Sequence, residues 1–200
     1  MIHPLILSPV LEMLNSWDIT LFYLINHGTQ NRFFDIIMPY LTDIDNWRIP
    51  MGVVWIGLLI FGGKKGRIVA LLVVVCLAFT DQLSSSVLKP VFARTRPCKI
   101  LEHVHLLVNC SSAFSFPSSH ATNIFAQAAL FSYSYRKLTP FVFVFAALVG
   151  YSRVYVGVHF PFDVLFGATL GVSCTTIVLI CKGVMTEVIR QVRIRNSKTA

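Results

Sequence analysis

Three short polar clusters interrupt an otherwise apolar chain. They cover residues 89–97, 116–120 and 152–163 and read KPVFARTRP, FPSSH and SRVYVGVHFPFD. Together they hold two histidines, an aspartate, well-placed cations and small hydroxyl residues. Ionisable groups at the edges of apolar segments are energetically expensive, so this concentration of them indicates a functional site. The combination suits an oxyanion such as phosphate, because cations would hold it while one imidazole attacks and another donates a proton.

The third cluster contains a histidine and an aspartate that can act together. His159 and Asp163 are four residues apart, a spacing that brings them together if the turn between them is helical. A carboxylate bonded to one ring nitrogen fixes the tautomer and makes the other nitrogen a better nucleophile or base. Arg153 is expected at the end of the preceding helix, close enough to neutralise a phosphoryl group. Lys89 and Arg96 would complete the cationic clamp.

The second cluster is expected at the start of a helix. Pro117 suits the first turn, where proline is favoured, and Ser118, Ser119 and His120 would then lie at the N-terminus. Free backbone N–H groups and the helix dipole make such an end a site for anions. Pro161 would open the last helix in the same way, so two helix starts would point toward one face of the protein.

The composition places this chemistry in a membrane. The 200 residues are 55% hydrophobic and 13% charged, whereas a soluble domain has roughly 25% charged residues. The mean hydropathy is +0.69. The net charge of +8 does not indicate nucleic acid, because the basic residues occupy the tail and short breaks between apolar runs. We therefore expect the membrane as a partner, no nucleic acid and no obligate protein partner.

Five apolar stretches approach the roughly 20 residues that are needed to cross a bilayer. Unpaired backbone groups are not tolerated in hydrocarbon and no alternating barrel pattern is present, so these stretches are expected to be helices. The predicted fold class is an all-α integral membrane bundle of about five transmembrane helices, with six as the alternative. The expected spans are residues 47–62, 67–88, 120–136, 138–156 and 161–182.

The segment before these spans has a different pattern. In residues 9–45, aromatic and aliphatic residues recur at helical spacing among Asn, Asp and Gln, which fits two short amphipathic helices in the outer interface. A kinked sixth span is the alternative. We thus expect a single domain over residues 1–200, with interfacial helices in 1–45, a transmembrane core in 46–182 and a basic cytoplasmic tail in 183–200.

The distribution of charge predicts the orientation. Basic residues gather in two connections and in the tail, and by the positive-inside rule these parts belong in the cytoplasm. The loops at 89–119 and 153–163 would then face outward, toward the periplasm or the outside of a bacterial inner membrane. Those loops are also basic, against the rule, which suggests that their cations are retained for a ligand. The residues expected inside are Lys64, Lys65, Arg67, Arg136, Lys137, Lys182, Arg190, Arg193, Arg195 and Lys198.

The order and spacing of the three clusters resemble a known family. The pattern K-x6-RP in residues 89–97, PSSH in 117–120 and SR-x5-H-x3-D in 152–163 is similar to the signature of the type 2 phosphatidic acid phosphatase (PAP2) superfamily. Its members include membrane lipid phosphatases and soluble vanadium haloperoxidases. Three spaced motifs in the right order make a specific match, and the remaining segments fit the layout of the membrane members.

The resemblance implies a role for each matched residue. His159 would be the nucleophile that forms a phosphohistidine, Asp163 its orienting partner, and His120 the group that protonates the leaving oxygen. The phosphoryl oxygens would be bound by Lys89, Arg96, Arg153, Ser118 and the backbone N–H of Ser119. Phosphatases of the superfamily need no metal, so neither a metal nor a cofactor is expected. One position departs from the pattern, because Ser119 stands where the family usually has glycine; serine keeps the N–H donor but tolerates fewer backbone angles.

The sequence predicts less specific roles for the other polar residues. Arg94 lies inside the first cluster without an assigned role, and a solvated or lipid-headgroup contact is expected for it. The polar run at 81–86 is expected to form a structural hydrogen-bond network below the site, with a catalytic role as the alternative. His103 and His105 are expected at the surface or at the rim of the substrate site rather than at a metal.

The five cysteines divide into two groups. Cys76, Cys174 and Cys181 fall in predicted spans, where they would pack as small apolar groups. Cys98 and Cys110 share the predicted outer loop, which is an oxidising location if the orientation is right. Both a disulfide and two free thiols remain open for this pair.

These features predict an integral membrane phosphatase that removes a terminal phosphate from a lipid phosphate or diphosphate at the outer face of the membrane. By analogy with small bacterial members of the superfamily, undecaprenyl diphosphate is the expected substrate. Lipid A, phosphatidylglycerol phosphate and phosphatidic acid are the alternatives. Two rival functions are vanadate-dependent halide oxidation, which occurs in soluble relatives, and non-catalytic binding or transport of a lipid headgroup.

Overall fold

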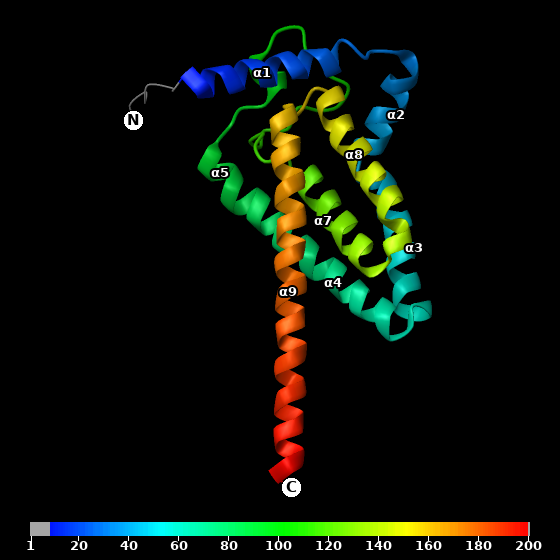
Figure 1. Ribbon diagram of the computed structural model, residues 1–200. Coiled ribbons are helices and arrows are strands. Elements are labelled where there is room, and N and C mark those ends of the chain that lie inside the picture. The colour runs from blue at the N-terminus through cyan, green and yellow to red at the C-terminus, as the bar shows by residue number, and fades with distance from the viewer. Residues whose placement is uncertain (1–8, 200) are drawn as a thin grey trace.

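The computed structural model of the protein describes residues 9–199, so residues 1–8 of the predicted N-terminal segment and Ala200 of the predicted tail lie outside the described residues. Within the described range every regular element is helical, which confirms the prediction of an all-α chain (Figure 1). The elements are α1 (Pro9–Asn26), α2 (Arg32–Thr42), α3 (Asp45–Phe61), α4 (Gly63–Asp81), the π-helix η1 (Gln82–Leu88), α5 (Lys89–Phe92), α6 (Pro97–Ile100), α7 (Ser119–Ser134), the 3-10 helix η2 (Arg136–Leu138), α8 (Thr139–Tyr155) and α9 (Pro161–Thr199).

Several of these elements are long and apolar enough to cross a membrane. Among the described residues, three helical segments meet this requirement: Gly63–Ile100, Arg136–Tyr155 and Pro161–Asn196. A fourth is added if α2 and α3, which are bent by 54° relative to each other, cross as one broken span. The expected spans at 67–88, 138–156 and 161–182 correspond to these three segments, and the one at 47–62 falls in the bent pair of α2 and α3. The expected span at 120–136 corresponds to α7, which has 16 residues and is not among the candidate spans of the described residues.

The centre of the bundle is α7, against which α4, α8 and α9 all pack. The most extensive packing is between α7 and α9. The backbones of these two helices come so close at Gly171 that the position must be a glycine. A Cβ atom on Gly171 of α9 would lie 2.1 Å from the carbonyl oxygen of Thr122, which is too close for any other residue. Small residues that let helices approach in this way are typical of membrane helix packing.

The two predicted N-terminal helices are present as α1 and α2. Figure 1 shows α1 lying across one end of the bundle, nearly at right angles to α9. It packs on α8 and α9, whereas α2 packs on α8. Both helices cover residues 152–161, a stretch in which every residue is buried. The third polar cluster is thus enclosed by segments from the opposite end of the chain, while the depth of α1 and α2 in a bilayer stays a prediction.

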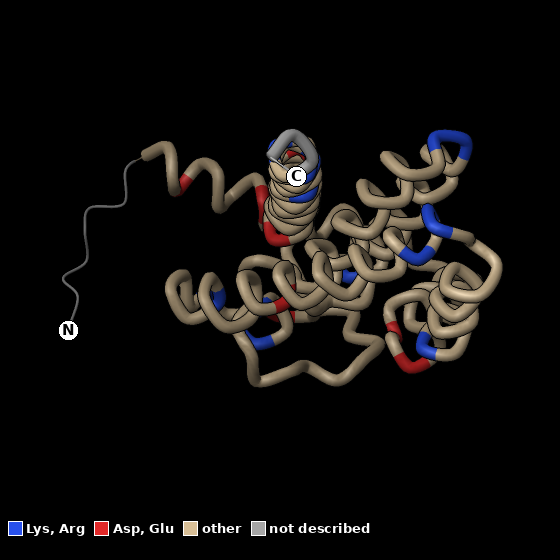
Figure 2. The backbone as a smooth tube through the Cα atoms, turned by 90° about the horizontal axis from the view of Figure 1, so that it is seen from below, with Lys and Arg blue, Asp and Glu red and all other residues tan. Residues whose placement is uncertain are grey.

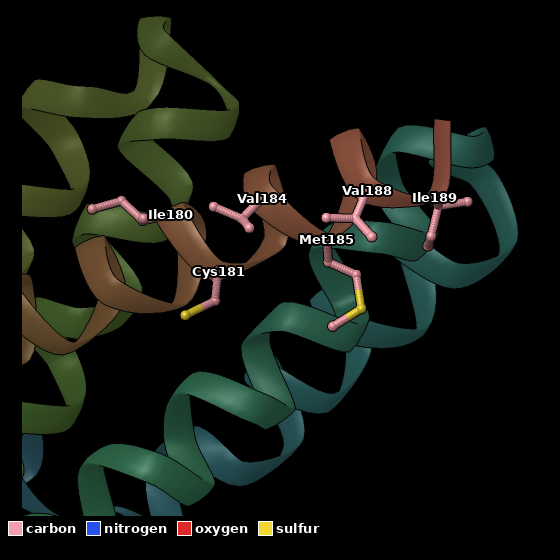
Figure 3. A pocket seen from close by; sticks show the side chains of 6 residues that line it. All are labelled: Ile180, Cys181, Val184, Met185, Val188 and Ile189. Atoms are coloured by element: carbon pink, nitrogen blue, oxygen red, sulfur yellow. The ribbon is translucent and has the colours of Figure 1, made fainter. Parts of the chain in front are cut away.

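The last helix extends well past the predicted end of its span at residue 182. With 39 residues and a rise of 1.5 Å per residue, α9 is about 58 Å long, whereas the hydrocarbon core of a bilayer is about 30 Å thick. Its distal half projects beyond the bundle in Figure 1 and carries exposed apolar side chains that form the shallow pocket in Figure 3. Its lining residues are Ile180, Cys181, Val184, Met185, Val188 and Ile189.

The basic connections gather at one end of the bundle, away from the start of α9 (Figures 1 and 2). The ammonium group of Lys65, beside the α3–α4 turn, lies 4.4 Å from the ring centroid of Tyr135. This contact joins that turn to the end of α7, next to Arg136 and Lys137. Two of the three predicted inward-facing basic groups are therefore neighbours in space.

Candidate active site

The fold brings the three polar clusters together. Cluster one lies in α5, α6 and the turn between them, cluster two starts α7, and cluster three forms the turn from α8 to α9. The charges of Lys89, Arg96 and Arg153 all act on the imidazole of His120, as does His159. Four cationic or imidazole groups, two from the first cluster and two from the third, thus lie close enough to the half-buried His120 to act on its charge.

The pair of His159 and Asp163 is present as predicted and is supplemented by a serine. His159 Nδ1 lies 3.5 Å from Asp163 Oδ2, and both residues are almost completely buried. The hydroxyl of Ser115 donates a short hydrogen bond to the same Oδ2 and lies 3.5 Å from Nδ1. The backbone N–H of Phe160 also donates to Oδ2, at 2.9 Å. The carboxylate is therefore held on the Nδ1 side of the ring.

Arg96 fixes the tautomer of His159 from the other side. Its Nη1 lies 3.1 Å from His159 Nε2 and 2.9 Å from the carbonyl oxygen of Val158, and its Nε donates to the carbonyl oxygen of Ala113 at 2.8 Å. Arginine has only donors, so Nε2 must present its lone pair to Arg96. The proton of the neutral ring then lies on Nδ1, facing Asp163 and Ser115. This is the tautomer that a nucleophilic Nε2 requires.

Arg153 has donor capacity that the described residues do not use. It lies in the last turn of α8 and is 9% exposed, and its Nη1 bonds to the hydroxyl of Thr42. Among the described residues, its buried Nε has no hydrogen-bond partner. Buried polar groups are nearly always satisfied, so an unpaired guanidinium N–H beside His120 and His159 suits an anionic ligand.

The start of α7 differs in one respect from the expectation. Pro117 precedes the helix and is not in its first turn, because the N-cap is Ser118 and the helix begins at Ser119. The Ser118 side chain accepts from the N–H of Ala121 at 3.4 Å, while the Ser118 N–H donates to the carbonyl oxygen of Asp163 at 3.1 Å. The first turn of α7 and the first turn of α9 are thus joined directly, and the N-terminal N–H groups of α7 lie next to His120.

Gly157 allows the chain to turn between Arg153 and His159. Its φ of +85° is in the left-handed region, and a Cβ atom there would lie 2.6 Å from Val104 Cγ1 and 3.0 Å from the carbonyl oxygen of His105. Both the backbone angle and the space exclude a side chain. The spacing between the two site residues therefore depends on this glycine.

The surroundings of His159 lower its pKa. The residue lies between the membrane-spanning segments and is completely enclosed, and burial lowers the pKa to about 3; the positive charges of Arg153 and Arg96 add to this effect, and Asp163 opposes it. The imidazole is therefore held in its neutral, nucleophilic form. A histidine in an unfolded chain has a pKa of about 6.5.

We expect a nuclear magnetic resonance titration of histidine-labelled protein to show this directly. The signal of His159, identified by its loss in His159→Gln, should not move between pH 8 and about pH 5. Because only the unfolded chain binds a proton at His159 between about pH 6.5 and pH 3, stability should fall as pH is lowered through that window. A midpoint near pH 6.5 for His159 would contradict the enclosed site.

A profile of the PAP2 superfamily matches residues 68–186, more than half of the chain. The chain belongs to the PAP2 superfamily. It is 30% identical over 171 residues to the lipid A 4'-phosphatase of Bacteroides thetaiotaomicron. That match covers 81% of this chain and 75% of the relative. It is 33% identical over 156 residues to the undecaprenyl-diphosphatase of Sulfolobus acidocaldarius, a match that covers 78% of this chain and 73% of the relative.

A solved structure agrees with these relatives. The transmembrane PAP2-type phosphatidylglycerolphosphate phosphatase from Bacillus subtilis is similar with a TM-score of 0.67 and 27% identity, over 88% of this chain and 87% of that chain. The predictions of an all-α integral membrane protein and of a phosphatase of the PAP2 superfamily are thereby confirmed.

Three residues around the PAP2 motifs were not anticipated as parts of the site. Ser115 is completely buried against His159 and Asp163. The expectation of a solvated or headgroup contact for Arg94 is wrong, because Arg94 bonds to Asp163 Oδ1 and to Asp18 Oδ2, each at 2.7 Å. The only sequence signal for Asp18 was a carboxylate among the apolar residues of α1.

The polar run that precedes the PAP2 motifs forms the expected network. Ser85 of the π-helix bonds to Asp81 at 3.3 Å and to the hydroxyl of Ser119 at 3.0 Å. Asn123 bonds to Thr80 at 2.7 Å and to Asp81 at 3.4 Å. Serine in place of the usual glycine at position 119 is therefore accommodated by a hydrogen bond to Ser85.

His103, His105 and the free cysteines are not among the groups that contact His159 or Asp163 in the described residues. His105 is half-buried and pairs with Asp35, with 2.8 Å between Nε2 and Oδ1, while His103 is exposed. Of the three free cysteines, Cys76 and Cys174 are buried as expected and Cys181 is exposed on α9.

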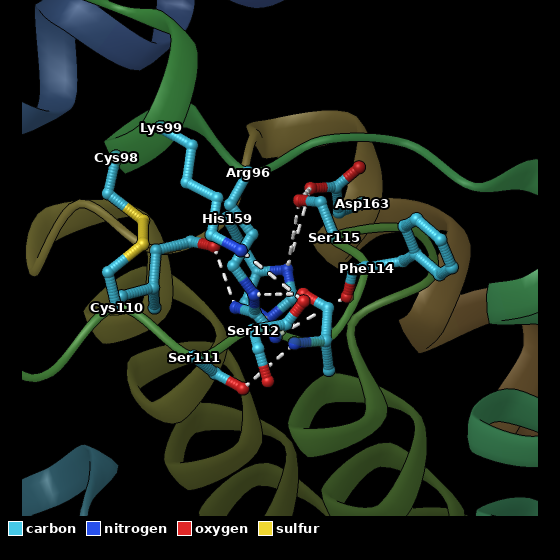
Figure 4. Close-up of a disulfide and its surroundings, with 12 residues drawn as sticks. Arg96, Cys98, Lys99, Cys110, Ser111, Ser112, Phe114, Ser115, His159 and Asp163 are labelled. Atoms are coloured by element: carbon cyan, nitrogen blue, oxygen red, sulfur yellow. Dashed lines mark hydrogen bonds and ion pairs between the residues drawn. A yellow bond between two sulfur atoms is a disulfide. The ribbon is translucent and has the colours of Figure 1, made fainter.

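Cys98 and Cys110 form a disulfide beside the site (Figure 4). Cys98 follows Arg96 by two residues, and Cys110 precedes Ala113, the carbonyl acceptor of Arg96, by three. A second link runs in parallel, since Lys99 Nζ donates to the carbonyl oxygen of Ser112 at 3.3 Å. The disulfide thus joins the segment that carries Arg96 to the loop segment that holds its guanidinium.

Removal of this disulfide is expected to weaken both stability and catalysis. The double variant Cys98→Ser/Cys110→Ser should lose about 3 kcal/mol of unfolding free energy on the chain-entropy estimate, and its kcat/KM should fall several-fold because Arg96 is less well held. Treatment of the wild type with reductant should reproduce the loss, and Cys181→Ser should have no effect. Unchanged activity and stability in the double variant would contradict this role.

Proposed function

We propose that this PAP2 protein hydrolyses the terminal phosphate of a membrane lipid phosphate or diphosphate through a phosphohistidine on His159. The observation that carries the proposal is the position of His159 Nε2. Its lone pair faces the buried cation Arg96, while Asp163 and Ser115 hold the proton on Nδ1. Positioning and charge neutralisation account for most of the catalysis of phosphoryl transfer.

The first half of the reaction transfers the phosphoryl group to the enzyme. Lys89, Arg96 and Arg153 bind the phosphoryl oxygens, and Arg96 exchanges its contact with Nε2 for one with an oxygen, which frees the lone pair. Nε2 then forms a bond to phosphorus as the bond to the leaving oxygen breaks. His120, in its protonated form, gives its proton to that oxygen.

The second half releases inorganic phosphate. His120, now neutral, takes a proton from a water molecule, whose oxygen attacks phosphorus as the bond from phosphorus to Nε2 breaks. His159 regains its lone pair on Nε2, and His120 is protonated for the next cycle. Ser118 and the backbone N–H of Ser119 contribute to phosphate binding at the positive end of α7.

Two substrates have particular support. Undecaprenyl diphosphate is our first candidate, in keeping with the similarity to the undecaprenyl-diphosphatase of Sulfolobus acidocaldarius. Lipid A is the second, because the similarity to the lipid A 4'-phosphatase of Bacteroides thetaiotaomicron extends over 81% of this chain. Phosphatidylglycerol phosphate and phosphatidic acid remain in the set of substrates to be tested.

A panel assay tests both the function and the choice of lipid. The purified protein in mixed micelles is given each of these four lipids, and inorganic phosphate is measured against time with His159→Gln as the blank. We expect release that depends on His159, fastest with undecaprenyl diphosphate. If inorganic phosphate were released fastest from lipid A, lipid A would be the preferred substrate instead. Failure to release phosphate from any of them would favour a non-catalytic headgroup-binding protein.

We further propose that the site faces the periplasm or outside of a bacterial inner membrane, with the C-terminus in the cytoplasm. This orientation is supported by the basic turns at Lys65 and Arg136, which lie together at the end of the bundle away from the site. Cysteines introduced at Lys65 or Glu102 would be treated with a membrane-impermeant maleimide in intact cells. We expect labelling at position 102 only, and labelling at position 65 only would reverse the orientation.

A further inference from the structure

Asp18 is a buried carboxylate on a helix whose other side chains are mostly exposed. It lies in the third turn of α1 and is 1% exposed, whereas its neighbours Trp17 and Leu21 are exposed. A carboxylate is removed from water at a large cost unless charged or hydrogen-bonding partners compensate. The partners of Asp18 therefore indicate what its burial serves.

One oxygen of Asp18 binds the segment that carries His159 and Asp163, and the other binds Arg94. Oδ1 accepts a hydrogen bond of 2.8 Å from the backbone N–H of Phe162, the residue before Asp163. Oδ2 accepts a hydrogen bond of 2.7 Å from Arg94 Nη2. Asp18 thus holds the backbone beside Asp163 and also a cation that reaches Asp163.

Arg94 joins the two buried carboxylates through the two arms of its guanidinium. Nη1 donates to Asp163 Oδ1 and Nη2 to Asp18 Oδ2, both at 2.7 Å. The guanidinium carbon lies 4.1 Å from the centroid of the Phe160 ring. A planar fork can bind two carboxylates in this way, whereas lysine offers a single point charge.

This arrangement determines which oxygen of Asp163 is left for His159. Arg94 occupies Oδ1, so Oδ2 is the oxygen that faces Nδ1 of His159 and the hydroxyl of Ser115. A rotation of the carboxylate would break the bond to Arg94, and a movement of Arg94 would leave Asp18 buried without its ion pair. Two residues that do not reach His159 therefore hold Asp163 at Oδ1, in addition to the bonds that Ser115 and the Phe160 N–H make to Oδ2.

We propose that Asp18 and Arg94 are positioning residues, which together hold the carboxylate of Asp163 so that His159 keeps its proton on Nδ1. Asp18 of α1 then supports the active site, although it lies outside the PAP2 match at residues 68–186. Neither side chain touches the reacting atoms, because both act through Asp163. The inference rests on the proposed role of His159 as the nucleophile.

Kinetics of two conservative variants test this role. Asp18→Asn removes the charge at nearly constant shape, and Arg94→Lys retains the charge without the fork. We expect each to lower kcat on the order of 10- to 100-fold, as is typical for groups that orient a functional histidine, with KM changed by less than about threefold. Glu12→Gln, on the exposed face of the same helix, is the matched control and should behave as wild type.

A variant of Asp163 separates positioning from a general structural role. In an Asp163→Asn background, Asp18→Asn should lower kcat by less than about twofold, because residues that act through one partner are not additive. A further loss as large as that in the wild-type background would overturn the proposal, as would wild-type kcat in both Asp18→Asn and Arg94→Lys. If Asp18→Asn does not yield folded protein, Arg94→Lys carries the same comparison.

The tautomer of His159 provides a readout that does not depend on turnover. Nitrogen-15 spectra of histidine-labelled wild type should show a single Nδ1–H tautomer for His159, and Asp18→Asn should show a mixture of tautomers. An unchanged tautomer in both Asp18→Asn and Arg94→Lys would overturn the positioning role even if lipid hydrolysis is found. A change in tautomer without lipid hydrolysis by the wild type would instead retain the positioning role and refute the proposed function.

Discussion

Replacing His159 by glutamine is expected to lower kcat for lipid phosphate hydrolysis by at least about 10³-fold, because loss of a nucleophile removes the covalent route entirely. Glutamine retains a polar group of similar size, so Arg96 and Ser115 keep hydrogen-bond partners in the buried site. The loss should therefore be in kcat with little change in the affinity for the lipid. Phosphate release from mixed micelles and binding of a non-hydrolysable lipid phosphonate measure the two quantities.

The control for this variant is His27→Gln, since His27 is an exposed histidine directly after the end of α1. It should retain wild-type kcat. A His159→Gln protein that is folded and turns over within tenfold of wild type would rule out His159 as the nucleophile. A loss of lipid affinity without a change in kcat would assign His159 to binding instead.

Replacing His120 by glutamine should produce a loss that depends on the leaving group. His120 is surrounded by the other site groups, and general acids contribute typically about 10²- to 10⁴-fold. We expect a reduction of this size with phosphatidic acid, whose leaving alkoxide needs a proton. With p-nitrophenyl phosphate, the rate of phosphoryl transfer to His159, measured as the pre-steady-state burst of p-nitrophenol, should fall much less, because an acidic phenol leaves without assistance.

The comparison of the two histidine variants makes this prediction specific. His159→Gln should lose activity on both substrates, since the nucleophile is required whatever the leaving group. Equal losses on the two substrates in His120→Gln would show that His120 binds or positions the phosphoryl group and does not donate a proton to the leaving oxygen.

The parts of the site that the sequence predicts are those set by local geometry. Asp163 lies near His159 because four residues and one turn separate them, and Arg153 lies in the last turn of α8, as the predicted end of that span near residue 156 implies. The helix starts at Ser119 and Pro161 follow from proline and serine chemistry, although Pro117 proved to precede the cap and not to lie in the first turn. Each of these features needs only a few consecutive residues.

The parts that were missed depend on contacts between distant segments. Arg94 was expected to contact solvent or a lipid headgroup because the motif assigns it no role, whereas its partners Asp18 and Asp163 are 76 and 69 residues away. Ser115 lies outside the matched motifs and becomes part of the site only when the loop folds over His159. The disulfide could not be chosen over free thiols until the loop between Cys98 and Cys110 was placed.

Trapping of the phosphorylated enzyme tests the account most directly. The protein is mixed with a lipid labelled in its terminal phosphate, quenched in base within milliseconds to seconds, digested and examined by mass spectrometry for phosphorylated peptides. We predict a phosphoryl group on His159 that is stable in base and is lost in acid. The rate constants for its formation and its decay should each be at least as large as kcat. Label on another side chain, or steady turnover with no label on His159 at any quench time, would contradict the account.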